Sequence, residues 1–250
     1  MQPSQPSGFR RARTDAQKAQ RRAAILSAAR SLAEGKGVRT VTLGDIAAEV
    51  GLAKSNVLQY FETREDIYLE LTIQGWREWV QACRTRLDHL TPSAASIAEA
   101  LADCLSERPL LCQLFAYRDS NLEHNVSAET LHSLRNTATA AHLELATAIA
   151  RALPQVDEWA ADDLINVTTM LAGTVWLRAN PPAALSAVYE EDPTCPIPSL
   201  DFAATLRSLI HALILGLTAG EEAQRRLFHF QAVTQQPQTR GQRKASKRFR

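Results

Sequence analysis

Residues 42–61 read TLGDIAAEVGLAKSNVLQYF, and this stretch decides how the rest of the sequence is interpreted. Thr42 can cap a short helix that starts one residue later, with Asp45 as its partner in a capping box. Gly51 ends this helix, and a second short helix covers residues 54–60. The apolar residues of both helices are spaced to bury between them: Ile46, Ala47, Val50, Leu52 and Val57. Two short helices joined by a tight glycine turn predict a helix-turn-helix, whose second helix enters the major groove of DNA.

The exposed positions of the second helix carry side chains suited to DNA. They offer donors and acceptors for phosphates and base edges, and Leu58 offers an apolar contact for a thymine methyl group. The expected set is Lys54, Ser55, Asn56, Leu58, Gln59 and Tyr60. The same pattern also fits an ordinary helical hairpin with a solvated polar face, because helix-turn-helix patterns give false positives.

The segment and its flanks resemble the amino-terminal signature of the TetR/AcrR family of bacterial transcriptional regulators, over about residues 19–79. The resemblance is carried by Thr42, Ile46-Ala47, Val50-Gly51, Val57, Tyr60-Phe61 and Arg64-Glu65-Asp66. It implies a homodimer that binds a double-stranded DNA operator and responds to a small-molecule effector of unknown identity. The leading hypothesis is a repressor released from a pseudo-palindromic operator by that effector. The alternative is an all-α ligand-binding or interaction protein without specific DNA binding.

The resemblance also implies roles for individual residues. Thr42 caps its helix and contacts a phosphate, residues 54–59 face the groove, and Tyr60 touches the DNA backbone. Arg64 takes the place of the family's usual Lys at the start of the next helix, where the helix dipole also favours a phosphate. Two positions depart from the pattern. Ala53 stands where Ser or Thr commonly caps the second helix, which should cost about 1 kcal/mol, and Leu58 replaces a frequent Tyr.

Helical periodicity covers nearly everything between residues 14 and 230, and 45% of the 250 residues are apolar, enough for a core. The sequence therefore predicts an all-α fold with two domains. Longer helices are expected over about residues 15–34, 64–87, 93–105, 156–179 and 200–217, with a loop between the last two. One further helix is expected to start at residue 109, and another is expected to end at residue 153. The predicted organisation is a disordered basic arm at 1–13, a helix-turn-helix DNA-binding domain at 14–63, a helical ligand-binding and dimerisation domain at 64–231 and a disordered basic tail at 232–250.

Charge is distributed unevenly although the net charge is only +1. Residues 1–60 hold ten basic and four acidic residues, and the last eleven hold six basic residues and no acid. Residues 61–239 hold 12 basic and 23 acidic residues. A basic front on an acidic body suggests that one end binds a polyanion. Three arginines near the amino terminus, Arg10, Arg11 and Arg13, either enter a minor groove and track phosphates or form a solvated tail.

The sequence shows no signature of enzyme, metal or membrane chemistry. GxSxG, HExxH and phosphate-loop motifs are missing, and no two of the six His are spaced i,i+4, so no catalytic residue, metal or cofactor is predicted. Cys83, Cys104, Cys112 and Cys195 lack metal-ligand spacing and are interpreted as buried apolar residues in a reducing compartment. No apolar run approaches the roughly 20 residues of a membrane helix, and the amino terminus lacks the apolar core of a signal peptide. A soluble cytoplasmic protein that does not bind membranes is expected.

The body offers candidates for an effector pocket and a dimer seam. Aromatic and polar residues among apolar helices suggest the pocket: Trp76, Trp79, Cys83, Phe115, Tyr117, His142 and Trp176. The alternative is that most of these are ordinary core residues. The family resemblance implies that the last two long helices pair in a four-helix bundle, with an apolar seam from Leu171, Val175, Leu206, Leu209, Ile210, Leu213 and Leu217.

Overall fold

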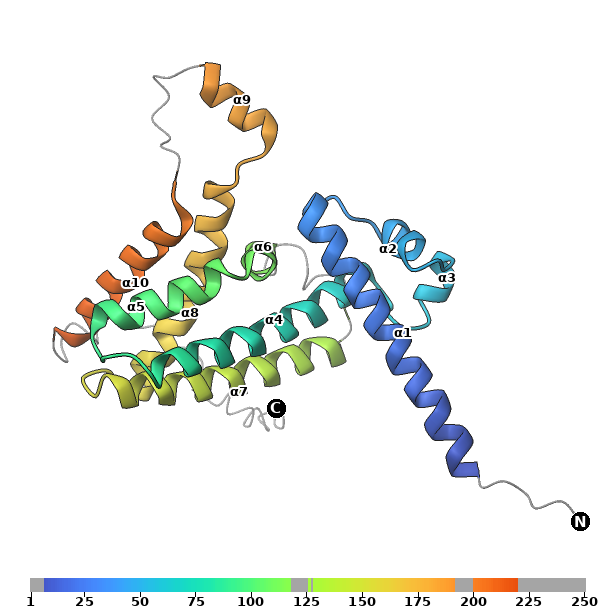
Figure 1. Ribbon diagram of the computed structural model, residues 1–250, viewed down its shortest axis with the longest axis horizontal. Helices are drawn as coiled ribbons and strands as arrows, with labels where there is room; N and C mark the ends of the chain where they lie inside the picture. The colour runs from blue at the N-terminus through green and yellow to red at the C-terminus, as the bar shows by residue number, and fades with distance from the viewer. Residues whose placement is uncertain (1–6, 118–125, 127, 192–199, 220–250) are drawn as a thin grey trace, which may run out of the picture.

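The computed structural model describes residues 7–117, 126, 128–191 and 200–219, and within these ranges the regular secondary structure is entirely helical (Figure 1). The helices are α1 (Ser7–Lys36), α2 (Leu43–Glu49), α3 (Lys54–Val57), α4 (Arg64–Leu87), α5 (Ala94–Ser106), α6 (Pro109–Tyr117), α7 (Ala128–Ala152), α8 (Glu158–Ala179), α9 (Ala183–Glu191) and α10 (Phe202–Thr218). The all-α prediction is confirmed. In the described part of the chain, no helix combines the length and apolar character that crossing a bilayer requires.

The helices form a small amino-terminal unit and a larger body (Figure 1). Helices α1–α3 lie at one end, and the first half of α1 projects beyond them. In the body, α4 packs against α7, α5 packs against α10, and α8 contacts α6, α7 and α10. The fold thus consists of an amino-terminal helix-turn-helix domain followed by a larger helical domain.

Two hydrophobic cores correspond to these units, and α4 belongs to both. Its first half, from Ile67 to Ile73, packs in the amino-terminal core with α1, α2 and α3. From Trp76 onward it packs in the body core. The cores therefore divide inside α4, several residues beyond the boundary expected between residues 63 and 64.

Helix α6 is the second element shared by the cores. Leu110 and Leu114 pack in the amino-terminal core, whereas Leu111 and Phe115 pack in the body core. Adjacent faces of one nine-residue helix thus touch both units. Gln113 adds a polar link, because its Oε1 accepts a hydrogen bond from the backbone N–H of Val38 at 3.3 Å.

Gly173 explains how closely α8 approaches α6. A Cβ atom at this position would lie 2.8 Å from the backbone nitrogen of Ala116 and 3.0 Å from its Cα atom. Real Cβ atoms do not come this close to backbone, so only glycine permits the observed distance between the two helices.

Two helix boundaries and one additional helix differ most from the expectation. Helix α1 begins at Ser7, so the expectation of disorder over 1–13 is wrong for residues 7–13; residues 1–6 and the predicted tail at 232–250 lie outside the described ranges. Helix α3 ends at Val57, three residues earlier than expected. Helix α9 occupies part of the segment expected to be a loop, and it starts directly after two prolines, Pro181 and Pro182.

The dimer seam expected from α8 and α10 is also largely wrong. Leu206, Ile210 and Leu217 are fully buried inside the chain itself, and Val175 is nearly so. Leu171 and Leu213 pack against the body core as well. Of the expected residues, Leu209 alone is exposed. The apolar stripe read from the sequence is the face that these helices turn toward their own core.

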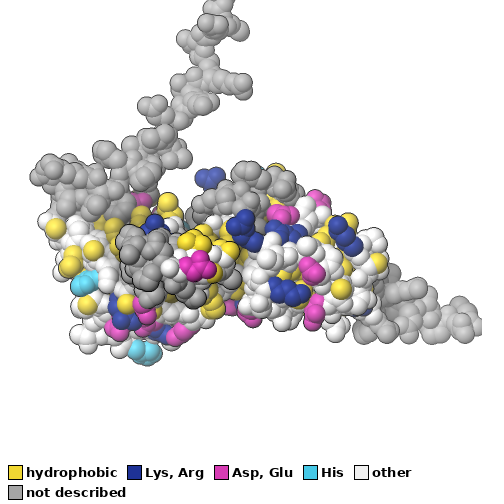
Figure 2. All heavy atoms as spheres, turned by 90° about the horizontal axis from the view of Figure 1, so that it is seen from above, with side chains coloured by type: hydrophobic (Ala, Val, Ile, Leu, Met, Phe, Trp, Pro, Cys, Tyr) yellow, Lys and Arg dark blue, Asp and Glu magenta, His cyan; other side chains and the backbone are white. Residues whose placement is uncertain are grey.

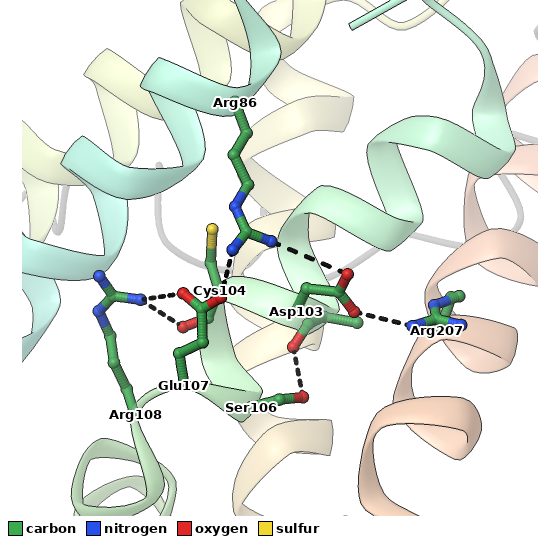
Figure 3. A network of polar contacts seen from close by, with 8 residues as sticks. Arg86, Asp103, Cys104, Ser106, Glu107, Arg108 and Arg207 are labelled. Atoms are coloured by element: carbon green, nitrogen blue, oxygen red, sulfur yellow. Dashed lines mark hydrogen bonds and ion pairs between the residues drawn. The ribbon is translucent and has the colours of Figure 1, made fainter.

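A charged network joins the carboxyl-terminal ends of α4 and α5 to α10 (Figure 3). Asp103 accepts a hydrogen bond from Arg207 at 2.8 Å, and its other carboxylate oxygen lies 3.8 Å from Arg86. Glu107 binds Arg86 and lies 3.7 Å from Arg108. All five side chains are partly exposed, so each pair is worth at most about 1 kcal/mol. The network therefore links α4, α5 and α10 but adds little to the stability of the fold.

Candidate nucleic-acid interface

The turn between α2 and α3 is built by hydrogen bonds that require glycine at its centre. Gly51 has a φ of +66°. Its N–H donates to the carbonyl of Ala48 at 3.1 Å, and the N–H of Leu52 donates to the carbonyl of Ala47 at 2.9 Å. This pair of bonds is the Schellman motif, in which the residue after the cap adopts the left-handed conformation. The expected glycine turn is confirmed.

The two helices pack through the residues read from the sequence. Ile46, Ala47 and Val57 are buried, and Val50 and Leu52 are half-buried against the same core. Burial of this apolar face turns the polar face of α3 outward.

The outward face of α3 carries the predicted DNA-reading residues. Lys54, Ser55, Asn56, Leu58 and Gln59 are all exposed, and 43% of Leu58 is accessible to water. Beyond the single α-helical turn the chain tightens, because the N–H of Gln59 bonds to the carbonyl of Asn56 and that of Tyr60 to the carbonyl of Val57. Tyr60 is half-buried where this segment meets α1.

Ala53 leaves the start of α3 without a side-chain cap, as its sequence position predicted. Helices α2 and α4 are capped by threonine boxes instead. The Thr63 hydroxyl accepts a hydrogen bond from the N–H of Asp66 at 3.0 Å. Of α2, α3 and α4, the short helix α3 therefore has the least local stabilisation at its start.

Thr42 and Asp45 close the capping box at the start of α2. The Thr42 hydroxyl accepts from the N–H of Asp45 at 3.2 Å and donates to its carboxylate at 2.7 Å, and the Thr42 N–H donates to the same carboxylate at 2.8 Å. The hydrogen bonds from the Thr42 hydroxyl and backbone lower the pKa of Asp45. Capping by Thr42 is confirmed, and its contact with a phosphate stays a prediction.

Arg64 faces the protein rather than open solvent. Its guanidinium donates to the carbonyls of Val38 and Val41, at 3.2 and 2.9 Å, and to Glu65 at 3.1 Å. The ring of Tyr68 lies 5.4 Å below it. These partners make Arg64 a clamp that ties the loop between α1 and α2 to the start of α4, a role that the family resemblance did not indicate.

Arg22 makes a second set of such contacts, which the sequence did not predict. Its guanidinium binds the carbonyl of Tyr60 and the carboxylate of Glu70, and it lies 4.1 Å from the centre of the Phe61 ring. It thus holds Tyr60 and Phe61, which follow α3, between α1 and α4. Its place one turn before the buried Ile25 was the available signal, because it puts Arg22 beside the apolar face of α1.

A groove of about 780 Å³ adjoins the recognition segment along α1. It is lined by Gln17, Lys18, Gln20, Arg21, Ala24, Gln59 and Tyr60. Lys18 and Arg21 are exposed and were not among the predicted site residues. Two cations and three amides beside α3 are the groups that bind phosphate oxygens in protein–DNA contacts.

The face of the molecule seen from above carries charges of both signs near the amino-terminal unit. Figure 2 shows Lys and Arg interleaved with Asp and Glu over the half of the molecule that holds α1–α3. On this face the attraction of the cations for a polyanion is offset by the neighbouring carboxylates.

The predicted effector-pocket residues fall into separate places. Trp76, Phe115 and His142 meet: the Trp76 ring lies 5.2 Å from that of Phe115 and 5.1 Å from that of His142. Tyr117 and Trp176 instead line an open hollow of about 700 Å³ where α6 and α8 face the loop after α1.

Trp79 and the cysteines are core residues of the body or lie outside the described part. Trp79 and Cys83 are fully buried. Cys83, Cys104 and Cys112 are free and buried, which confirms their interpretation as apolar core residues, and Cys195 lies outside the described ranges. Burial raises the pKa of Cys112 to about 12.

Comparison with known proteins assigns the class that this fold and site define. Residues 25–71 match the family model described as "Bacterial regulatory proteins, tetR family", and residues 74–221 match "Tetracyclin repressor-like, C-terminal domain". The chain belongs to the TetR family, and it is a DNA-binding regulator of transcription. The two matched segments meet inside α4, close to where the two cores divide.

Solved structures of similar fold include three bacterial regulators. The fatty acid degradation regulator FadR of Bacillus halodurans is 14% identical, with a TM-score of 0.49 over 79% of this chain and 98% of that one. A putative TetR-family regulator of Mesorhizobium loti is 16% identical, with a TM-score of 0.44 over 81% and 96% of the two chains. The TetR-family regulator PfmR of Thermus thermophilus is 17% identical, with a TM-score of 0.39 over 78% and 96%. Among curated proteins none matches this chain.

Proposed function

We propose that this regulator is a cytoplasmic homodimeric repressor that leaves a pseudo-palindromic operator when a small molecule binds its body. The observation that carries the proposal is the double role of α6. A ligand that moves Leu111 and Phe115 in the body core also moves Leu110 and Leu114 in the amino-terminal core. Binding in the body thereby shifts the position of the helix-turn-helix, and linkage requires that operator binding shifts the affinity for the ligand in return.

The proposed DNA contacts follow from exposure and position. They are Thr42, Lys54, Ser55, Asn56, Leu58, Gln59 and Tyr60, together with Lys18 and Arg21 of the α1 groove. Arg64 is left out because its donors already serve the protein. We keep residues 14–63 as the DNA-binding unit and residues 64–231 as the effector-binding and dimerisation unit, with the start of α4 contributing to the core of the first.

The proposed dimer uses the faces of α8 and α10 that point away from the body core. Met170 and Leu177 on α8 and Leu209 and Leu215 on α10 are exposed, and the two helices are neighbours. A two-fold axis here presents two recognition helices, as a pseudo-palindromic operator requires. Met170→Lys should shift the sedimentation coefficient from that of a dimer to that of a monomer. Leu143→Lys, at an equally exposed position on α7, serves as control and should leave the dimer intact.

A basic residue of α3 and one of the body test the DNA-binding surface. Lys54→Ala should weaken binding to an operator fragment and lower the magnitude of the slope of log affinity against log salt by about 1, because one phosphate contact is lost. Arg151→Ala removes the same charge at the end of α7, in the body, and should leave both quantities near those of the wild type. Equal losses in the two variants would show that only net charge matters.

Repression is tested by transcription in vitro from the same fragment. Added protein should reduce the transcript, and Lys54→Ala should reduce it less. An increase in transcript would instead identify an activator.

A further inference from the structure

A hollow of about 690 Å³ opens between α7, α8 and the middle of α4. Its walls include Trp76, Leu131, Leu134, His142, Asp162 and Asn166. Trp76 and the two leucines can contact an apolar ligand, and His142 can form a hydrogen bond with it.

His142 is the polar group that the fold leaves incomplete. Its side chain is 9% exposed, and its Nδ1 lies 3.1 Å from the carboxylate of Asp162. Its second ring nitrogen, Nε2, is buried and has no hydrogen-bond partner. A buried polar atom without a partner destabilises the free chain, so a ligand that supplies the partner gains affinity from it.

Asp162 decides what kind of partner Nε2 needs. An ionised carboxylate has no hydrogen to donate, so the hydrogen of the neutral imidazole lies on Nδ1. Nε2 is then left with a lone pair, which accepts a hydrogen bond. Asn166 Nδ2 lies 3.3 Å from the other oxygen of Asp162 and helps to hold that carboxylate in place.

The surroundings narrow the ligand further. The hollow holds one cation, Arg135, and one carboxylate, Asp162, so its charges do not favour an ion of either sign. At His142 the carboxylate of Asp162 disfavours an anion, and an ammonium group beside the buried Nε2 would lose its hydration. Because Nε2 has no exposed surface, the ligand reaches it by displacing a neighbouring side chain. Trp76 lines the hollow and packs against the imidazole, so it is the neighbour that has to shift. A flat ring that enters beside it can then stack on the indole.

We propose that this hollow binds an uncharged, flat aromatic alcohol, whose hydroxyl donates to His142 Nε2 while its ring packs against Trp76. The inference deepens the proposed ligand response and rests on it for its regulatory meaning. Movement of Trp76 reaches Phe115 on α6, and α6 reaches the amino-terminal core through Leu114.

The test compares two probes that differ in the donor alone, 2-naphthol and 2-methoxynaphthalene, titrated calorimetrically into the full chain. The wild type should bind the naphthol about tenfold more tightly, the factor that one well-formed buried hydrogen bond supplies. His142→Leu should bring the naphthol affinity down to that of the ether and leave the ether unchanged. His89→Leu, at an exposed histidine after α4 and outside the hollow, is the matched control and should change neither affinity.

Equal affinities of the wild type for the two probes, absence of binding by both, or a preference for naphthol that survives His142→Leu would each overturn the proposal. If circular dichroism shows that His142→Leu does not fold, Asp162→Asn decides. An amide can donate to Nδ1 and move the ring hydrogen to Nε2, so the preference for naphthol should disappear, and its persistence overturns the proposal.

Operator binding is measured on the same samples with and without probe, which separates this inference from the proposed function. A chain that discriminates the probes but retains no DNA keeps the ligand site and refutes the repressor. A chain that binds operator, and keeps it when naphthol is bound, refutes release by this ligand class and leaves the site intact.

Discussion

The amino-terminal core and the body core meet inside α4, and they differ in what sets the distances between their helices. In the amino-terminal unit the devices are local: threonine boxes start α2 and α4, and Gly51 turns the chain between α2 and α3. In the body the decisive contact joins residues far apart in the chain, because Gly173 lets α8 lie against the backbone of α6. Local devices can be read from a sequence, whereas a close approach between distant helices cannot.

The largest expected effect lies in the amino-terminal core. Ile46→Ala removes a fully buried side chain between α2 and α3 and should lower the free energy of unfolding by about 2–5 kcal/mol. Urea denaturation followed by circular dichroism measures this loss. Leu58→Ala, at an exposed position of the same motif, should change it by less than about 0.5 kcal/mol. Similar losses in the two variants would contradict the assignment of the inner and outer faces.

A single added carbon atom in the body should lower the free energy of unfolding. Gly173→Ala places a methyl group against the backbone of Ala116 and should destabilise the chain by about 1–3 kcal/mol, despite the better helix propensity of alanine. Gly75→Ala on α4 is the matched control, because its new methyl group meets only the side chain of Leu111, at 3.1 Å. The comparison fails if the two variants unfold at the same urea concentration.

These contrasts explain how much the sequence alone could predict. The capped start of α2, the Gly51 turn and the buried trio Ile46, Ala47 and Val57 depend on short-range chemistry, and the structure confirms them.

The dimer seam and the clamps depend on information that no local pattern holds. An apolar stripe on α10 shows that one face is buried, but it does not say whether the cover is the same chain or a second copy. Arg22 and Arg64 are arginines like their neighbours until the fold brings carbonyls and carboxylates to them. His142 and Asp162 are twenty residues apart on two helices, so their spacing in the sequence did not predict their contact.

The uncapped recognition helix offers a smaller test within the amino-terminal unit. Ala53→Ser supplies the missing side-chain acceptor at the start of α3 and should raise the free energy of unfolding by up to about 1 kcal/mol. Ala48→Ser, exposed within α2, introduces the same hydroxyl where no cap is needed and should lower stability slightly. If the Ala53→Ser variant gains nothing over this control, the start of α3 is already satisfied by other means.

The smallest expected effect concerns acid and the capping box of α2. The pKa of Asp45 is lowered by its hydrogen bonds from Thr42, so this interaction stabilises the folded chain above the ordinary value of 3.8. The stabilisation is lost as the pH falls through the lowered pKa. Relative to Thr42→Val, the advantage of the wild type should therefore hold from pH 7 to 5 and shrink below pH 3.8, in urea titrations at each pH. An advantage that is unchanged in acid would show that the carboxylate does not take part.

The central claim, that the outer face of α3 reads DNA sequence as part of a dimer, is tested most directly by selection of genomic fragments. The purified chain is offered sheared genomic DNA at two salt concentrations, and the retained fragments are sequenced. The account predicts an inverted repeat, with half-sites spaced by about one helical turn or a multiple of it, that survives the higher salt. Retention of fragments without a shared motif, lost steeply as salt rises, would contradict it.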